Sequence, residues 1–221
     1  MTGNHHAASG GYPREWAAYH ECGHAIAFWN LGLPFEYITL SAPPRVQPLK
    51  DGTVSTVAEK WLYSTCGIIS DYMHQGLIIE DNQISILLKG GAERYELADP
   101  STRQVVTRPL RAKAVAPGED LEELARIATG ENWPVNYCAS IWRDCELYVK
   151  GCAPAIEAVA GRLLAVDHMT FAEVSEVAEP AMLNKPAPVV PEWAPRRSLC
   201  CSRGRSGIRK KRNTDNTPQM T

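Results

Sequence analysis

The sequence lacks three features that would each assign it to a familiar class. It holds no apolar run near the roughly 20 residues of a membrane-spanning helix, no signal peptide at its start and no GxxxxGK[ST] phosphate-binding loop. We therefore expect a cytoplasmic protein that has no transmembrane segment and no means of its own to hydrolyse ATP.

Paired CxxC motifs are also missing, and the seven cysteines are an odd number. Cys138, Cys145 and Cys152 recur every seven residues, which places two helical turns between neighbours and separates them too far for shared metal coordination. We interpret these three, and Cys22, as small core residues. A reducing compartment suits this use of cysteine best.

The charge is distributed unevenly along the chain. Residues 196–221 hold eight Arg or Lys against one acid, a formal charge of +7, and since the whole chain is −2 the remainder sums to −9. Five prolines between Pro180 and Pro195 favour an extended segment. We expect a disordered leader, one domain, a Pro-rich linker and a basic disordered tail, over residues 1–11, 12–179, 180–195 and 196–221. The tail is a candidate for contact with nucleic acid or anionic surfaces.

Hydrophobic periodicity and caps predict a mainly α (α+β) fold. The stretch from Phe35 to Leu40 is typical of a strand, and Asp51-Gly52 predicts a turn into a returning strand at 53–57, which gives a small β-hairpin or sheet. Residues 77–116 are predicted as an excursion with one or two short elements. The predicted helices cover residues 13–31, 58–75, 121–130 (led in by 117–120), 135–149, 155–166 and 170–178.

The most informative segment is His20-Glu21-Cys22-Gly23-His24, an HExxH pattern within an apolar, helix-forming run. Positions i and i+4 share one face of a helix, so the two imidazoles can hold one ion, and zinc accepts neutral imidazole readily. Glu21 is then placed to take a proton from water as the catalytic base. The alternative is two ordinary histidines beside a solvated Glu21. The apolar flanks favour the metal, because a ligand helix should be buried.

Gly23 predicts a close contact. Glycine inside a helix costs about 1 kcal/mol relative to alanine, so its presence indicates the near approach of another backbone or of substrate.

A catalytic zinc needs three protein ligands, and the residues alone leave the third open. The extended HExxHxxGxxH pattern is absent, because residues 25–31 contain no histidine. The carboxylate candidates are Asp71, Glu80, Asp81 and Asp120, and the histidine candidates are His74 and His168.

The stretch Ala18-Tyr19-His20-Glu21-Cys22-Gly23-His24-Ala25 resembles the A-Y-H-E-A-G-H-A motif of the FtsH-type zinc metallopeptidases. Three looser similarities follow in order. Residues 66–71 with Gly76 resemble that family's A-G-R-x-A-E helix, with Asp71 in place of Glu. Residues 118–128 resemble its G-A-x-x-D-L segment, and residues 156–177 resemble its closing helical pattern.

This resemblance implies a helical, zincin-like peptidase domain without the family's ATPase and membrane segments. It places the third zinc ligand at Asp120, for which the alternative role is a helix N-cap. The function it implies is zinc-dependent hydrolysis of peptide bonds in flexible polypeptides, with a separate unfoldase or adaptor as a candidate partner. The alternative is a non-catalytic metal-binding or pseudo-protease scaffold that binds a protein partner, with the tail docking to nucleic acid or anionic surfaces.

Overall fold

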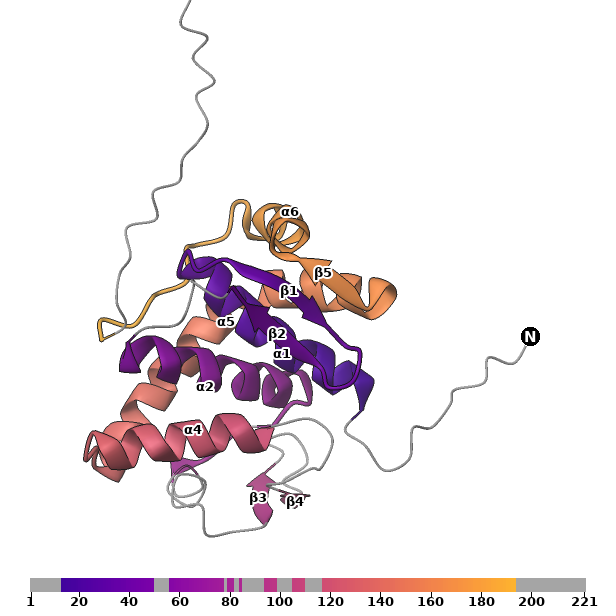
Figure 1. Cartoon of the computed structure of the whole chain (residues 1–221). Helices are drawn as coiled ribbons and strands as arrows, with labels where there is room; N and C mark the ends of the chain where they lie inside the picture. The colour runs from indigo at the N-terminus through magenta and orange to yellow at the C-terminus, as the bar shows by residue number, and fades with distance from the viewer. Residues whose placement is uncertain are drawn as a thin grey trace, which may run out of the picture.

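The computed structural model describes residues 13–49, 56–77, 79–81, 84, 94–98, 105–109 and 117–193, with backbone alone at 94–98, 105–109 and 117–119. This part of the chain is mainly helical, with one three-stranded and one two-stranded sheet (Figure 1). The predicted mainly helical class with a small sheet is therefore confirmed. The predicted leader 1–11 and the basic tail 196–221 lie outside the described residues.

The first two helices were predicted within one or two residues. Helix α1 covers Arg14–Asn30 and is followed by Gly32 with a φ of +67°, a left-handed conformation that glycine adopts freely. Helix α2 covers Val57–His74. A capping box opens α2, because Thr56 Oγ1 accepts from the Glu59 backbone N–H and the Glu59 carboxylate accepts from the Thr56 N–H.

A three-stranded antiparallel sheet lies beside α1, in the strand order β2-β1-β5 (Figure 1). Its strands are β1 (Phe35–Thr39), β2 (Arg45–Pro48) and β5 (His168–Thr170). Ile38 of β1 pairs with Val46 and with Met169, and all three side chains are buried in the core. Alternate residues of a strand face opposite sides, so this row fixes the inner face of the sheet.

The return strand differs from the prediction. Residues 53–55 lie outside the described part, and Val57, predicted as the end of a strand, instead opens α2. The chain reverses earlier, in the connection between Thr39, where β1 ends, and Arg45, where β2 begins, and Pro43 and Pro44 lie in that connection.

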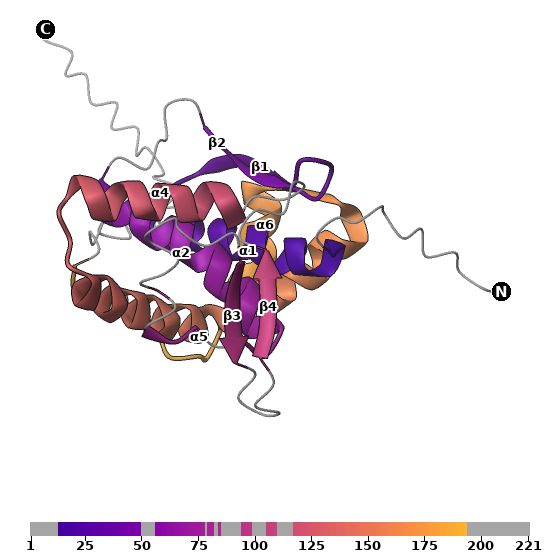
Figure 2. The same ribbon diagram turned by 90° about the horizontal axis from the view of Figure 1, so that it is seen from below.

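The helices that follow in the described residues include α4 (Pro117–Gly130), α5 (Val135–Val166) and α6 (Phe171–Met182). The predicted break between residues 149 and 155 is wrong, since α5 runs through Pro154 as one helix of 32 residues. Proline removes one backbone hydrogen bond, but Cys152, Ala155 and Ile156 on either side are buried in the core and hold the helix together. Seen from below, α2 lies between α4 and α5 (Figure 2).

The core is formed where α1, α2 and α5 meet. Its largest fully buried side chains include Trp61, Trp142, Tyr148 and Phe28. The cysteines that were interpreted as core residues are buried free thiols, which confirms that interpretation for Cys22, Cys138, Cys145 and Cys152.

Within the predicted excursion, strands β3 (Arg94–Ala98) and β4 (Val105–Pro109) pair antiparallel. A capping box of Thr170 and Glu173 opens α6, which continues past the predicted end at Ala178 to Met182. Pro180 lies in the last turn of α6, where the loss of one backbone hydrogen bond disturbs little of the helix, and the proline is therefore tolerated.

Residues 183–193, predicted as part of an extended linker, lie against the body. The indole Nε1–H of Trp193 donates to Asp144 Oδ2 of α5 at 3.0 Å. Pro188 packs on Gly151 of the same helix, where an added Cβ would come within 3.0 Å of the proline. The chain therefore leaves its described part from the surface of α5.

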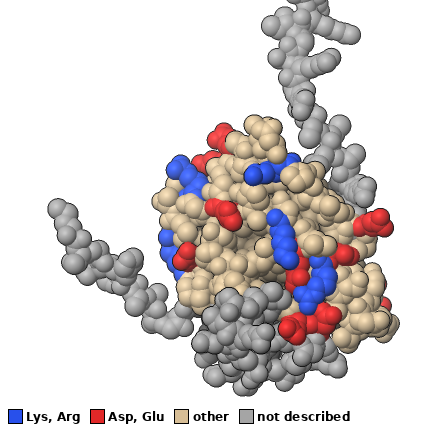
Figure 3. Space-filling view, turned by 180° about the vertical axis from the view of Figure 1, so that it is seen from behind, with Lys and Arg blue, Asp and Glu red and all other residues tan. Residues whose placement is uncertain are grey.

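No helix within the described ranges is both long and apolar enough to cross a membrane. Seen from behind, acidic and basic side chains alternate over the face, and neither sign forms a broad patch among the residues described there (Figure 3).

Candidate metal centre

Helix α1 brings His20 and His24 to one buried position. Their spacing of four residues places both imidazoles on one face, and the side chains are almost fully buried. The two Nε2 atoms lie 3.1 Å apart, with the rings nearly perpendicular at 84°. Two nitrogens thus converge on one point, as the HExxH spacing predicts.

Asp120 joins the two histidines from α4, 100 residues along the chain. Its Oδ2 lies 3.0 Å from His20 Nε2 and 3.1 Å from His24 Nε2. The three atoms therefore form a nearly equilateral triangle. A tetrahedral zinc with bonds of about 2.0–2.1 Å separates its ligand atoms by about 3.3–3.4 Å. The three groups fit a single zinc ion after an expansion of a few tenths of an ångström.

The tautomer of His24 is fixed by α2. Its Nδ1 lies 2.9 Å from the backbone carbonyl oxygen of Tyr63. A carbonyl only accepts, so Nδ1 carries the hydrogen and Nε2 of the neutral ring presents a lone pair. This lone pair faces the Asp120 carboxylate oxygen and the Nε2 atom of His20. A positive charge among the three atoms would relieve the repulsion between their lone pairs, and a metal ion or a proton can supply it.

Without a metal, a proton on His24 supplies that charge. Burial lowers the pKa of His24, but the Asp120 carboxylate beside it outweighs this effect and raises that pKa to about 9. Burial raises the pKa of Asp120, and the neighbouring His24 and His20 bring that pKa well below its ordinary value. The same three side chains therefore form a buried ion-pair cluster when no metal is bound.

The Nδ1 atoms of His20 and His24 differ in their hydrogen bonding. His20 Nδ1 is buried and has no hydrogen-bond partner within the described ranges. Metal-binding histidines usually donate from this position to an acceptor. His24 is thus held more firmly than His20.

Two glycines allow α1 and α2 to approach closely enough to build the site. A Cβ at Gly67 would overlap the His24 ring, and a Cβ at Gly23 would overlap the Cys66 backbone and lie 2.5 Å from Ser70 Oγ. The close approach predicted from Gly23 is therefore confirmed, and its partner is the backbone of α2. Gly67 leaves the space that the imidazole of His24 fills.

Tyr63 encloses His24 from another side. Its ring stacks on the imidazole with centroids 4.2 Å apart, and it meets Phe28 edge-on at 4.8 Å. Tyr63 therefore contributes both the stacked ring and the carbonyl that binds Nδ1. Neither contact was visible in the sequence, although Gly67 inside a helix carries the same signal as Gly23.

Glu21 follows His20 on α1 and is 5% exposed. Burial raises the pKa of its carboxyl group, and the two histidines and a backbone hydrogen bond from Val46 of β2 oppose that rise. A carboxylate whose pKa is raised is a stronger base than an ordinary one. Its position next to the cluster matches the role predicted for it.

The other candidate ligands have different neighbours. His74 stacks on Tyr19 and pairs with Glu15, and Asp81 binds Arg143. Asp71 accepts a hydrogen bond from Gln75.

Two further candidates also lie outside the cluster. His168 lies on β5 beside Tyr37, and Glu80 is an exposed residue after α2. The group formed by His20, His24 and Asp120 is the single metal-competent cluster found in the described part of the chain. Asp120 occupies the first turn of α4, which begins at Pro117, so a cap residue would precede it.

No model of a known protein family matches this chain, and the search of curated proteins finds no relative. The chemical interpretation of the site therefore depends on its own geometry.

Proposed function

We propose that the protein is a zinc-dependent metallopeptidase that cleaves flexible polypeptides, with a helical, zincin-like domain similar to the peptidase part of FtsH. The observation that carries this proposal is the triangle of two imidazole nitrogens and one carboxylate oxygen at 3.0–3.1 Å, with Glu21 buried beside it. Three ligands and an adjacent base are the minimum set for a catalytic zinc.

His20, His24 and Asp120 would hold the metal. Zinc in such a site polarises a carbonyl group and acidifies a nearby water molecule. Glu21 accepts the proton that this water loses as its oxygen attacks the peptide carbonyl. The same carboxyl group then donates the proton to the amine that leaves when the C–N bond breaks, which returns Glu21 to its charged form.

The neighbouring residues support the same chemistry. The Tyr63 carbonyl holds His24 in the tautomer that a metal requires. The burial of the site excludes bulk water, which strengthens every electrostatic interaction within it. Because the sequence carries no phosphate-binding loop for a motor, we propose unfolded or loosely folded substrates, or delivery by a separate unfoldase or adaptor.

Cleavage of fluorescently labelled casein tests the proposal through Glu21. Wild type should cleave casein. Glu21→Gln should keep its zinc, because Glu21 is no ligand, and lose activity by about 10²–10⁴-fold as expected for a missing general base. The matched control is Glu36→Gln, the same change at an exposed residue of β1, which should cleave like wild type.

Wild-type protein that carries zinc but cleaves neither casein nor a broad peptide library would contradict the peptidase. That result would favour the non-catalytic metal-binding scaffold that binds a protein partner.

A further inference from the structure

A pocket lies between α1, α2 and α5, and none of the three metal-site residues lines it. It has a volume of about 210 Å³. Drug-sized ligands occupy pockets of about 300–1,000 Å³, so this pocket suits a smaller group, such as one long side chain.

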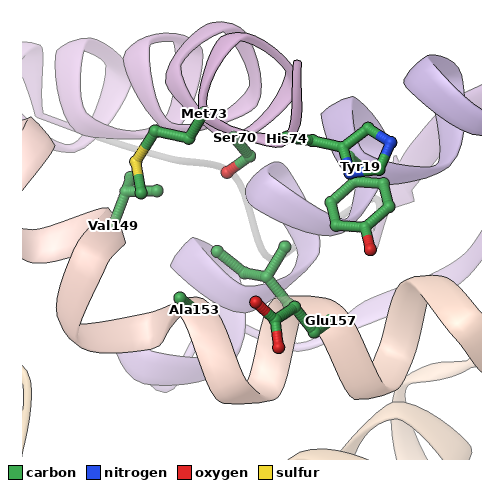
Figure 4. A pocket seen from close by; sticks show the side chains of 8 residues that line it. Tyr19, Ser70, Met73, His74, Val149, Ala153 and Glu157 are labelled. Carbon is green, nitrogen blue, oxygen red and sulfur yellow. The ribbon is translucent and has the colours of Figure 1, made fainter. Parts of the chain in front are cut away.

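The pocket has an apolar end and a polar end. Met73 of α2 and Val149 of α5 lie at the first, and Tyr19, His74 and Glu157 lie at the second (Figure 4). Ala153 and Ile156 extend the apolar wall along α5, and Ser70, whose hydroxyl already donates to the Cys66 carbonyl, completes the lining. An alkyl chain would fit the first end and a polar head the second.

The polar end favours a cation. The carboxylate of Glu157 faces the pocket (Figure 4). Outside the lining, Glu15 pairs with His74, with its carboxylate 3.2 Å from His74 Nε2. The ring of Tyr19, which stacks on His74 with centroids 3.6 Å apart, attracts cations through its π quadrupole, more weakly than a carboxylate does. No Lys or Arg lies among the residues lining the pocket. An ammonium or guanidinium group on an alkyl stem matches both ends.

We propose that the pocket binds an arginine or lysine side chain from residues 203–212 of this same chain. Arg203, Arg205, Arg209, Lys210, Lys211 and Arg212 supply six such groups. These side chains belong to residues 196–221, whose formal charge is +7, and residues 1–195 carry a formal charge of −9. The tail is therefore attracted electrostatically to the rest of the chain.

The geometry of α5 decides which residues can reach. The described chain ends near Asp144, where Trp193 binds, and Glu157 lies 13 residues further along α5. The distance from Asp144 to Glu157 is about 20 Å along the axis of α5, and the path of the tail around this helix adds about 10 Å. An extended chain covers about 3.3 Å per residue, so about nine residues are needed. Arg196 and Arg197 are therefore too close to Trp193, and Arg203 is the first basic residue within reach.

Because the tail is covalently attached to the domain, a weak contact between one of its side chains and the pocket is sufficient for binding. A tethered side chain meets its pocket at an effective concentration in the millimolar range. A single cation in a small pocket can then be bound for much of the time, and it should be released by salt because the attraction is electrostatic. The proposal is independent of the metal centre.

The test uses the full chain with a nitroxide spin label on Cys200 and ¹³C-labelled methionine methyl groups. Cys201→Ser leaves one thiol in the tail, and the five described cysteines are buried and so protected from the reagent. If the tail occupies the pocket, the nitroxide should broaden the methyl signal of Met73, which lines the pocket. The methyl signal of Met169, which lies on β5 and does not line the pocket, serves as the reference and should broaden less.

The broadening of Met73 should disappear in 0.5 M NaCl, where the Debye length is only a few ångströms. It should also disappear in Glu157→Gln and persist in the matched control Glu176→Gln, which changes an exposed residue of α6 outside the lining. A protein truncated after Pro195 should show a saturable Met73 shift when a synthetic peptide of residues 196–221 is added.

Absence of Met73 broadening in the full chain at low salt would overturn the proposal. Equal broadening in wild type and Glu157→Gln would also overturn it. A Met73 shift in the truncated protein with agmatine but not with the peptide would assign the pocket to a free organic cation and remove the tail as its occupant.

Discussion

The backbone carbonyl of Tyr63 accepts the Nδ1–H of His24 at 2.9 Å. Helix α2 thereby sets the protonation pattern of a proposed metal ligand on α1, and leaves the Nε2 of His24 facing His20 and Asp120. The same turn of α2 supplies Gly67, whose missing side chain is the space that the imidazole fills. Helix α2 is therefore as much a part of the site as the HExxH helix itself.

Gly67→Ala should damage the site without touching a ligand. The added methyl group would overlap the His24 ring, so the zinc affinity should fall by about 10–100-fold, as when the support of a ligand is lost. Overpacking should also cost about 1–3 kcal/mol in the free energy of unfolding. Zinc competition with a chromophoric chelator and urea denaturation measure the two effects.

The matched control for this change is Gly161→Ala. Gly161 is an exposed residue of α5 with open space at its Cβ position. Alanine there should stabilise the protein by up to about 1 kcal/mol and leave zinc affinity unchanged. Unaltered zinc binding in Gly67→Ala would show that the α1–α2 contact does not hold His24.

The zinc-free protein should lose stability as the pH rises from about 6.5 to about 9. The pKa of His24 rises on folding from 6.5 to about 9, because the Asp120 carboxylate outweighs burial. A group with a raised pKa stabilises the folded state fully below its unfolded pKa, and that contribution is lost as the pH passes its folded pKa. Thermal unfolding in EDTA between pH 6 and 9.5 measures the slope.

Two comparisons identify His24 as the source. His24→Gln should remove the decline, since the titrating group is gone. Zinc-loaded wild type should not show it either, because the metal takes the place of the proton. A decline that persists unchanged in His24→Gln would assign it to another group.

The local part of the site could be predicted from the sequence, and the distant part could not. His20 and His24 lie one helical turn apart, so their convergence follows from helix geometry. Asp120 lies 96 residues beyond His24, and the residues alone left it among six candidates. Tyr63 was not identified, because its contact with His24 depends on how two helices pack.

The fold shows the same division. Caps and periodicity located α1 and α2 within one residue at each end, since these signals lie within each helix. The end of α4 at Gly130 was also predicted, but α4 begins at Pro117, within the predicted lead-in. Pro154 predicted a break that burial of both flanks of α5 overrides. The strand at 35–40 was predicted, but its partner strand begins at Arg45, directly after Pro44, and not after Asp51-Gly52. Signals within each segment therefore identified these helices and the first strand, and tertiary packing determined where they end and which strand pairs with which.

Pro154→Ala should stabilise the protein. If α5 is continuous, alanine restores the hydrogen bond to the Lys150 carbonyl and removes a ring that crowds the turn, a gain of up to about 3 kcal/mol. Pro180→Ala, in the last turn of α6, should change stability much less. Chemical denaturation measures both variants, and a loss of stability in Pro154→Ala would indicate that the proline ends a helix.

Metal analysis of the purified chain tests the central claim most directly. Wild type should carry close to one zinc per chain, and His20→Ala, His24→Ala and Asp120→Ala should each lose it because every one removes a ligand atom from the triangle. If Asp120 served only the fold, its mutation to alanine would lower stability and leave the metal bound. Full retention of zinc in all three variants would contradict the metal centre.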